Sequence, residues 1–446
     1  MKTTIVSAKS LKSQDAYRID SEFWEDGLIQ NEASVQSNKL LRNFVEPEGN
    51  IQTFPSDTTK SFKYLEINDV ALHSTTYQLK EIHPRSIPSR AKHLLKKNDV
   101  AVSTVRPVRN AVALIGTDDI VGPSAFTILR SKTVPGEFLW AFCKTDYFRN
   151  YLVRRQRNSM YPAVTAKDVL SIPVFTTTSD LQREVTSKLK TSNDLLTKYL
   201  QKYRLLQTAV LEQMGIHFGS HSNTKTFFRS LSYVKHARRL DAKFFDPNHS
   251  ELDDVFGSRL RTATLEEIAV IDKGVEVGKE QYIGNGIPFV RVSDVDRFNL
   301  GVNKSISQQV YNQFKAARIK QGDILLTKDA TLGMVHHLYY EPKPMLISSG
   351  IVRLRIRDEE SVPTYYLAMV LDTPITSNQI KRESSGSNIS HWNLDRVRNC
   401  RVPLLSSRKM NSINDQVRQM CTKITEAQHG IFDVIEQLNR HITPII

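Results

Sequence analysis

The sequence contains one ordered set of short motifs twice, and this internal repeat constrains the fold more than any other feature. Residues 16–24 read AYRIDSEFW and residues 237–245 read ARRLDAKFF, so Arg, Asp, Phe and a further aromatic residue recur in one order. The two aspartates, Asp20 and Asp241, are 221 residues apart in a chain of 446 residues. A match of this kind calls for a search for further repeated blocks before any other assignment.

Further blocks do follow in the same order. YLEINDV (64–70) pairs with FVRVSDV (289–295), NDVAVST (98–104) with GDILLTK (322–328), and SAFTILR (124–130) with SGIVRLR (349–355). The offset rises slowly to 234 residues between Gln182 and Gln416, as small loop insertions would produce. The chain is therefore a tandem duplication of a unit of about 210 residues, which is a usual size for a domain.

Composition restricts the class of protein. Hydrophobic residues make up 40% and charged residues 24% of the chain, which is typical of a soluble globular protein. No apolar run approaches the roughly 20 residues of a membrane span, and the N-terminus lacks the apolar segment of a signal peptide. Three scattered cysteines, Cys143, Cys400 and Cys421, favour neither a disulfide framework nor a CxxC metal site. We therefore expect a cytoplasmic protein.

Each half begins with a strand-rich part. Short β-branched runs separated by turn residues, such as FKYLEI and AFTILR in the first half and DILLT and GIVRLRI in the second, predict strands. Helical stretches intervene, at 137–156 in the first half and 363–373 in the second. This mixture predicts an α+β domain with a mixed or antiparallel sheet in each half.

Each half ends in a long helix with a heptad seam, in which apolar residues alternate at spacings of four and three. The first seam is Val185, Leu189, Ser192, Leu196, Tyr199, Tyr203, Leu206 and Val210, and the second is Ile413, Val417, Met420, Ile424, Ala427, Ile431, Val434 and Leu438. The seams predict that the two helices pack on each other as an antiparallel coiled coil; the alternative is that each seam packs on its own globular domain. The predicted organisation is domain 1 (1–178), helix 1 (179–222), domain 2 (223–408) and helix 2 (409–446).

Charge points to a polyanionic partner. The formal net charge is +14 and the isoelectric point is near 9.5. Two similar basic domains suit duplex DNA, in which two short sequences with an unread gap between them can be bound. The sequence thus predicts that the repeat exists because the chain reads DNA twice.

Base edges and phosphates are bound by Arg, Lys, Asn, Gln, Ser and Thr side chains, and these gather in polar loops after strands. In the first half the candidates are Arg106, Arg109, Arg154, Arg155, Arg157, Asn158 and Tyr161. In the second half they are Lys328, Thr331, Lys381, Arg382, Ser384, Ser387, Asn388 and His391.

Catalytic signatures are missing from the sequence. It has no G-x-x-x-x-G-K-[ST] phosphate loop and no NPP[YF] motif of the amino-methyltransferases. Neighbours on a strand face opposite ways, so His336 and His337 cannot share a metal, and we expect both to be structural. Asp20 and Asp241 are expected to cap or stabilise the start of each domain, and Asp69 and Asp294 to form Asx turns. We expect no catalytic and no metal-binding residues.

Several stretches of the chain resemble the specificity subunits of Type I restriction-modification systems. They are GDILLTKDATLGMV, SSGIVRLR, SSGSNISHWNLDRVRNCRVPL and the Pro-then-Gln entry into a heptad helix. The resemblance covers nearly the whole chain. It implies two tandem target-recognition domains, each followed by a spacer helix, with the spacers forming an antiparallel coiled coil. It also implies a subunit without catalysis, which binds double-stranded DNA and two methyltransferase subunits and is joined by nuclease/translocase subunits. S-adenosylmethionine, ATP and Mg²⁺ would then belong to those partners.

The first half departs from the family pattern. It has NDVAVSTVRPVRNAVAL where the second half has GDILLTKDATLGMVHHL, and NSMYPAVTAKDVL where the second half has SSGSNISHWNLDRV. Divergence of the two domains implies an asymmetric DNA site. Three alternatives remain open: a specificity protein whose partner is a fused nuclease-methyltransferase, a nucleic-acid-binding coiled-coil adaptor, and an enzyme with an unrecognised site.

Overall fold

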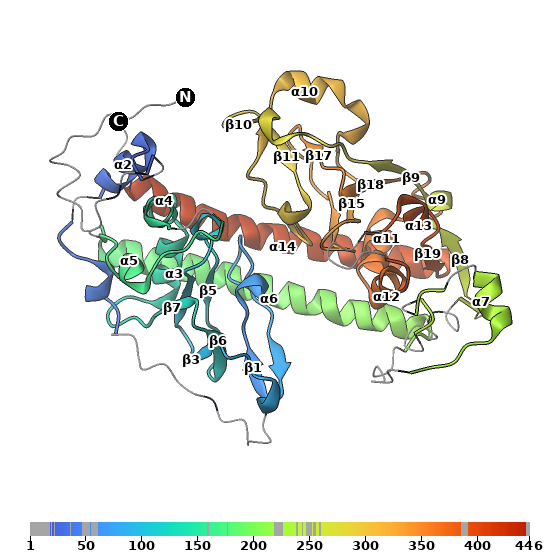
Figure 1. Ribbon diagram of the computed structural model, residues 1–446, viewed down its shortest axis with the longest axis horizontal. Helices are drawn as coiled ribbons and strands as arrows, with labels where there is room; N and C mark the ends of the chain where they lie inside the picture. The colour runs from blue at the N-terminus through green and yellow to red at the C-terminus, as the bar shows by residue number, and fades with distance from the viewer. Residues whose placement is uncertain are drawn as a thin grey trace. The chain divides into compact units, whose positions relative to one another are not determined.

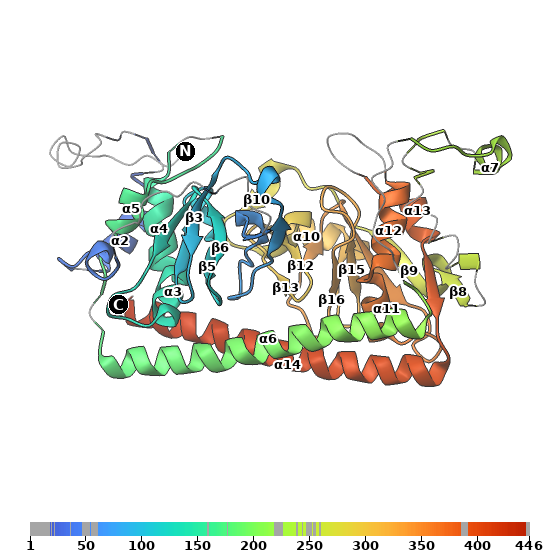
Figure 2. The ribbon, with the colours of Figure 1, turned by 90° about the horizontal axis from the view of Figure 1, so that it is seen from below.

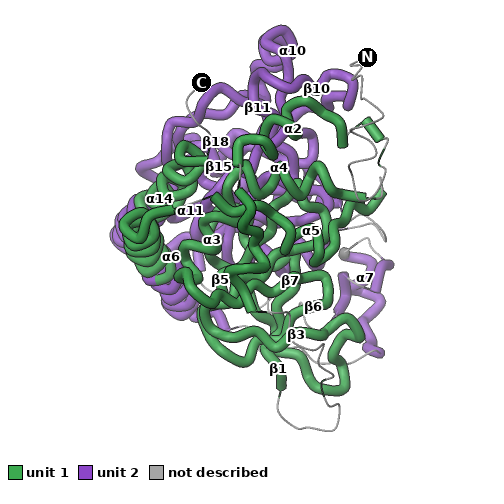
Figure 3. Tube along the Cα trace, turned by 90° about the vertical axis from the view of Figure 1, so that its left-hand side faces the viewer, with its two compact units in different colours: residues 1–197, 426–446 green, residues 198–425 purple. Residues whose placement is uncertain are grey.

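The computed structural model describes residues 18–442 except residues 19, 22, 36, 47–53, 55–60, 158–159, 176, 218–225, 238–239, 243, 247–251, 253–255, 258–259 and 385–390. The chain divides into two compact units (Figure 3). Unit 1 comprises residues 1–197 and 426–446, and unit 2 comprises residues 198–425. Each unit is an α+β domain that includes part of both long helices, so the predicted fold class is confirmed.

Unit 1 contains two sheets. The first has the order β2-β1-β6-β3, in which β1 and β6 are parallel and the other neighbours antiparallel. The second has the antiparallel order β5-β4-β7. The strands are β1 (Phe62–Tyr64), β2 (Lys80–Ile82), β3 (Ala91–Leu95), β4 (Val100–Ser103), β5 (Val112–Leu114), β6 (Ile120–Pro123) and β7 (Phe126–Leu129).

The helices of unit 1 lie beside these sheets (Figure 1). They are α2 (Asp26–Ala33), α3 (Gly136–Lys144), α4 (Asp146–Arg155) and α5 (Ala166–Leu170), with short 3-10 turns η2 (Ile67–Asp69) and η4 (Pro107–Arg109) in the loops. Helix α3 contacts β4 and β5, and the indole of buried Trp140 donates to the carbonyl of Val112 at 3.0 Å. The second sheet of unit 1 is thereby fixed to α3.

Unit 2 repeats this arrangement with additions. Its strands are β8 (Arg261–Thr264), β9 (Ala269–Lys273), β10 (Tyr282–Ile283), β11 (Ile287–Val290), β12 (Val295–Asp296), β13 (Asn299–Leu300), β14 (Ser305–Ile306), β15 (Ile324–Thr327), β16 (Val335–His337), β17 (Leu346–Ile347), β18 (Ile351–Ile356) and β19 (Arg401–Leu404). The sheet β16-β15-β18 matches β5-β4-β7 and gains β9 as a fourth strand. The parallel pair β11–β17 matches β1–β6.

Three helices of unit 2 correspond to helices of unit 1. The helices of unit 2 are α7 (Leu231–Ala237), α9 (Leu265–Ile268), α10 (Gln308–Gln313), α11 (Thr364–Leu371), α12 (Pro374–Glu383) and α13 (Leu394–Arg398), with η7 at Val292–Asp294. Helices α11, α12 and α13 occupy the places of α3, α4 and α5. The sequence repeat is therefore a repeat of structure.

One buried ion pair recurs at the same place in both repeats. Asp99, at the entrance to β4, binds Arg130 with two hydrogen bonds of 2.8 and 2.7 Å, and it accepts a third from the backbone N–H of Lys96 at 2.8 Å. Asp323, at the entrance to β15, binds Arg355 at 2.7 and 2.8 Å and accepts from Lys320 N–H at 2.9 Å. Both carboxylates are buried, so each pair fixes a central strand to its neighbour.

Two long helices complete both units: α6 (Ser179–Gln213) and α14 (Ser407–Ile442). In unit 2, Tyr203 and Val210 of α6 share a core with Ile413 and Val417 of α14. In unit 1, Lys188 Nζ donates to Gln437 Oε1 at 3.4 Å. The C-terminal half of α6 thus meets the N-terminal half of α14 in unit 2, and the reverse holds in unit 1, which is antiparallel pairing (Figure 2).

The predicted seams are buried, apart from Ser192, Tyr199 and Met420, which are half-buried. The seam also packs on globular parts of unit 2, since Tyr366 and Trp392 belong to the same core as Tyr203 and Ile413. The alternative thus holds for Ile413 and Val417 of α14, which pack on the domain that precedes them, whereas Tyr203 of α6 packs on the second domain and not on its own. Helix α6 begins at the predicted residue 179 and ends at Gln213, before Gly215 adopts a φ of +68°. Within the described ranges, no helix is long and apolar enough to cross a membrane.

The recurrent ion pair should stabilise unit 1. Asp99→Asn removes the charge of a carboxylate that is 1% exposed, and we expect a loss of about 2 kcal/mol in the free energy of unfolding. Urea denaturation would measure it. Asp415→Asn, at an exposed ion pair on α14, is the matched control and should change the unfolding free energy by less than about 0.5 kcal/mol.

The two adjacent histidines should make unit 2 acid-sensitive. Burial lowers the pKa of His336 to about 4 and that of His337 to about 3. Because these folded-state values lie below the ordinary value of 6.5, the neutral rings favour the folded state above pH 6.5, and this contribution is lost as pH falls toward 4. We expect about 2 kcal/mol per histidine to be lost between pH 7 and pH 5. Thermal melts of His337→Phe should show a shallower pH dependence; an unchanged slope would contradict this.

Candidate nucleic-acid interface

The first candidate site is built by the loop that leaves β4. This first exit loop, residues 104–111, carries the turn η4 between two residues in the left-handed region, Arg106 (φ 50°) and Asn110 (φ 48°). Left-handed backbone is unfavourable for residues other than glycine, and such strain is concentrated at functional sites. The loop therefore has a conformation that the surrounding structure must maintain.

A second segment holds this loop in place. The N–H of Arg106 donates to the carbonyl of Pro162 at 2.7 Å, and that of Val164 donates to Thr104 at 2.8 Å. Val105 and Ala163 form an isolated β-bridge. These bonds bring Tyr161, whose side chain is 68% exposed, beside the loop. Arg106, Arg109 and Tyr161, which the sequence predicted to act together, are thus neighbours.

The loop forms one wall of an open pocket of about 360 Å³. Its polar lining consists of Glu66, Asn68, Arg90, Arg106, Arg109 and Tyr161. Arg109 donates to Asn68 Oδ1 at 3.1 Å, and Arg90 donates to Glu66 Oε1 at 2.7 Å. Burial, followed by the charge of Arg106, lowers the pKa of Arg109.

This lining has the chemistry that binds nucleic acid. Guanidinium groups match phosphate oxygens and the acceptor edge of guanine, and an exposed tyrosine ring offers a stacking surface. Sequence reasoning missed Arg90, Asn68 and Glu66. Asn68 could have been found, because it stands in the repeated [NS]-D-V motif beside a predicted turn.

The second candidate site is built by the corresponding loop after β15. This second exit loop, residues 328–334, also uses the left-handed region, at Ala330 (φ 59°) and Gly333 (φ 77°). The N–H of Lys328 donates to Gly350 at 2.8 Å, as that of Thr104 donates to Ala125 at 2.9 Å. The bridge Asp329–His391 takes the place of Val105–Ala163. The two loops thus leave equivalent strands with equivalent anchors.

The chemistry of the second loop is different. Asp329 accepts from Lys328 Nζ at 2.6 Å and contacts His391 Nδ1 at 2.8 Å. Burial raises the pKa of Asp329, but hydrogen bonds from Lys328 and His391 outweigh burial and hold it below its ordinary value. Lys328 is 8% exposed, whereas Thr331 and His391 are exposed. The structure therefore brings Lys328, Thr331 and His391 together, with Thr331 and His391 facing solvent.

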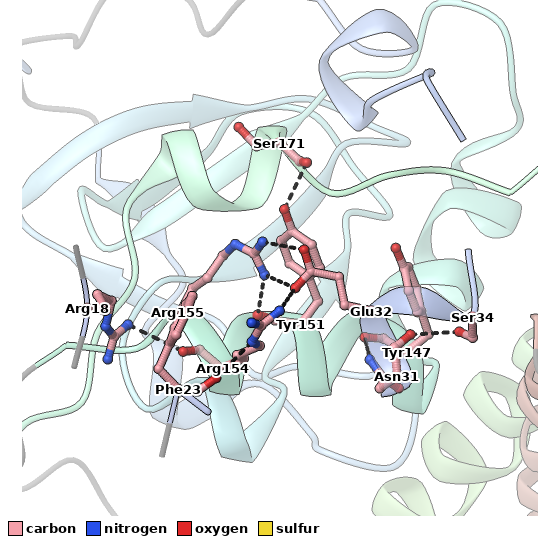
Figure 4. A network of polar contacts seen from close by, with 10 residues as sticks. All are labelled: Arg18, Phe23, Asn31, Glu32, Ser34, Tyr147, Tyr151, Arg154, Arg155 and Ser171. Atoms are coloured by element: carbon pink, nitrogen blue, oxygen red, sulfur yellow. Dashed lines mark hydrogen bonds and ion pairs between the residues drawn. The ribbon is translucent and has the colours of Figure 1, made fainter. Parts of the chain in front are cut away.

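Arg154 and Arg155 require a correction. Both guanidinium groups bind the carboxylate of Glu32 on α2 (Figure 4), with Arg155 Nη2 at 2.7 Å from Glu32 Oε1. Arg154 is 6% exposed and lies over the ring of Phe23 at 4.3 Å. Arg155 lies over Tyr151 at 3.5 Å. Both guanidinium groups therefore bind groups within unit 1, and we no longer expect either arginine to contact DNA.

Arg382 and Ser384 require the same correction in unit 2. Arg382 lies over the ring of Phe244 at 4.4 Å and donates to the hydroxyl of Tyr233 at 2.9 Å. Ser384 is 5% exposed. Both side chains are therefore used inside unit 2.

These contacts explain the motif that opens each repeat. Phe23 and Phe244 each contact an arginine from equivalent helices, Arg154 of α4 and Arg382 of α12. Asp20 accepts from the N–H of Phe23 at 3.1 Å, and Asp241 accepts from that of Phe244 at 3.3 Å. The predicted capping role of both aspartates is confirmed.

The remaining candidates fall into two groups. Arg157 is exposed and lies 3.4 Å from Asp168, and Lys381 is exposed. Asn158, Ser387 and Asn388 lie outside the described residues. In the part of the chain that the structure describes, no group of three His, Cys, Asp or Glu side chains could hold a metal ion. His336 donates from Nδ1 to the carbonyl of Asp296 at 2.7 Å, as a structural histidine would.

Comparison with known proteins relates the second half of the chain to one family. Residues 259–443 match the family described as Type I restriction modification DNA specificity domain. The specificity subunit of the EcoBI Type I restriction enzyme of Escherichia coli is 23% identical over 159 residues, 35% of this chain and 33% of that relative. The match thus spans about a third of the relative's own length.

Two solved structures resemble the chain over most of its length. The HsdS subunit of Thermoanaerobacter tengcongensis is 20% identical, with 91% of this chain and 94% of that chain covered and a TM-score of 0.33. The S subunit from M. genitalium is 12% identical, with 92% and 97% covered and a TM-score of 0.40.

The second half of the chain is therefore similar to the DNA specificity domains of Type I restriction-modification systems. The first half repeats the three-stranded core sheet of this matched region, with β5-β4-β7 in the place of β16-β15-β18.

The corrected assignment of the arginines can be tested in a pair of variants. Arg106→Ala removes an exposed cation from the first pocket, and we expect DNA affinity to fall about tenfold with an unchanged melting temperature. Arg154→Ala leaves Glu32 half paired, so we expect a lower melting temperature and unchanged affinity below it. Fluorescence anisotropy and thermal melts would measure both, and the reverse pattern would contradict the assignment.

Proposed function

We propose that this chain is the DNA-recognition subunit of a Type I restriction-modification complex, and that each domain reads one part of a bipartite, gapped, asymmetric site. The observation that carries the proposal is the pair of exit loops. They leave equivalent strands in the two repeats, have equivalent anchors and present different side chains.

The differences between the loops favour two different half-sites. The first pocket combines three guanidinium groups with one carboxylate and one amide, whereas the second loop combines a neutralised Lys–Asp pair with an exposed histidine and threonine. Donor and acceptor patterns that differ select different base edges in the major groove. The net charge of +14 adds an attraction to phosphates that does not depend on sequence.

The proposed subunit performs no chemistry. Two adenine-N6 methyltransferase subunits would bind S-adenosylmethionine, and nuclease/translocase subunits would use ATP and Mg²⁺. In this scheme the present chain contributes binding and orientation, and the cofactors act in its partners.

The test of the proposal is a methylome. The chain would be expressed with its neighbouring methyltransferase in a methylation-free host, and modified adenines would be mapped by single-molecule sequencing. We expect a two-part, gapped, asymmetric motif that disappears when this chain is omitted. A motif that persists without it would contradict the proposal, and salt-sensitive binding without sequence preference would favour a nucleic-acid-binding adaptor.

A domain exchange tests whether each domain reads its own half of the DNA site. Replacing residues 223–408 with those of a relative of different specificity should change one half of the methylated motif and leave the other half intact. The unmodified chain and the exchange of residues 1–178 are the controls, and the latter should change the opposite half. A change in both halves after either exchange would mean that the domains do not read independently.

A further inference from the structure

The ammonium group of a half-buried lysine ties the first exit loop to the interior of unit 1. Lys144, the last residue of α3, donates from Nζ to the carbonyl of Asn110 at 2.7 Å and to the carbonyl of Leu72 at 2.8 Å. Asn110 is the left-handed residue that ends η4. The loop conformation that presents Arg106 and Arg109 is thus anchored at its C-terminal end by one cation.

The other acceptor belongs to a hairpin that contacts the long helix. Val70 and Tyr77 close this first hairpin, residues 70–77, by an isolated β-bridge. The hydroxyl of Thr75 in the hairpin donates to the side-chain amide oxygen of Asn193 on α6. Lys144 is therefore the junction between the exit loop and the hairpin that touches α6.

The corresponding position in the second repeat also contacts a hairpin, with the opposite charge, and it joins that hairpin to α6. Asp372 follows α11 as Lys144 ends α3, and each precedes a threonine whose hydroxyl donates to a carbonyl of the preceding helix. Asp372 accepts from Arg297 Nη2 at 2.7 Å and from Gln207 Nε2 at 3.0 Å. Arg297 lies in the hairpin formed by β12 and β13, and Gln207 lies on α6.

Energetics favour a specific role for Lys144. Burial lowers its pKa to about 7, so the position is costly for an ammonium group. No ion pair offsets this cost among the described contacts of Lys144, whose Nζ binds two backbone carbonyls and lies 5.9 Å from the ring of Trp140. An apolar residue would fill such a space at lower cost if packing were its only purpose.

We propose that Lys144 is a positioning residue for sequence recognition by the first domain: it fixes the exit loop so that Arg106 and Arg109 meet DNA in one geometry, without touching DNA itself. This inference rests on the proposed function, because it assigns the loop to DNA reading. A loop held in one arrangement discriminates between base pairs, whereas a loose loop still attracts phosphates.

The experiment compares discrimination at the two half-sites. The full chain, assembled with its methyltransferase, would be titrated with duplexes that carry the cognate site, a substitution in the first half-site or a substitution in the second. Lys144→Met keeps the length of the side chain and removes the ammonium. We expect it to lower discrimination at the first half-site about tenfold, and to leave discrimination at the second within about twofold.

Two further variants separate positioning from loss of stability. Asp99→Asn weakens the same unit at a site away from the loop, so it should lower the melting temperature while discrimination below that temperature stays unchanged. Lys144→Gln retains an amide donor for one of the two carbonyls and should give an intermediate loss, which keeps the test valid if Lys144→Met does not fold.

The outcomes are distinct. Equal loss at both half-sites, unchanged discrimination in both Lys144 variants, or the same loss in Asp99→Asn would overturn the inference. A wild-type complex that discriminates at neither half-site would refute the proposed function itself, before any variant is compared.

Discussion

The buried pair of carboxylate and guanidinium at the entrance to the central strand is the interaction on which each domain depends. Asp99 and Asp323 each receive two hydrogen bonds from an arginine and one from the backbone at the turn before the strand. A charge in this position is costly unless all its acceptors are used, and so the geometry of the turn, the strand and its neighbour is fixed together. The exit loops begin five residues after these aspartates, beyond the far ends of the strands that the pairs fix.

A second constraint arises from the path of the chain. Each long helix contributes to both units, because unit 1 combines residues 1–197 with residues 426–446 and unit 2 comprises residues 198–425. Near each of its ends, helix α14 also provides a side-chain acceptor for a backbone N–H at the start of another helix. Asn439 accepts from the N–H of Asp146 in unit 1, and Asn414 accepts from that of Tyr365 in unit 2. The first N–H groups of α4 and α11 gain partners in this way. Deletion of either helix would therefore damage both units.

The sequence predicted what depends on local order and periodicity, and it did not predict pairings between distant residues. The duplication, the seams of α6 and α14 and the place of the exit loops all follow from patterns within a few residues. The fate of Arg154 depends on Glu32, which is 122 residues away, and nothing near RRQR indicates that partner. Lys144 was missed for another reason, since its acceptors are backbone carbonyls, and these carry no signature in the sequence.

Comparison of the repeats separates scaffold from site. The ion pairs, the order of the three-stranded core sheet and the arginine–phenylalanine contacts are the same in both units. By contrast, the wall of the pocket has Glu66 in one repeat and Arg291 in the other, and the bridge beside the exit loop has Val105 in one and Asp329 in the other. Where Glu66 is replaced by Arg291, the neighbouring ion pair also changes. Asp69 pairs with Lys80 in unit 1, whereas the matching Asp294 pairs with Arg291 itself in unit 2. These charge differences lie beside the exit loops, where the proposed readers of two different half-sites would differ, while the core sheet and the ion pair that hold those loops are common to both units.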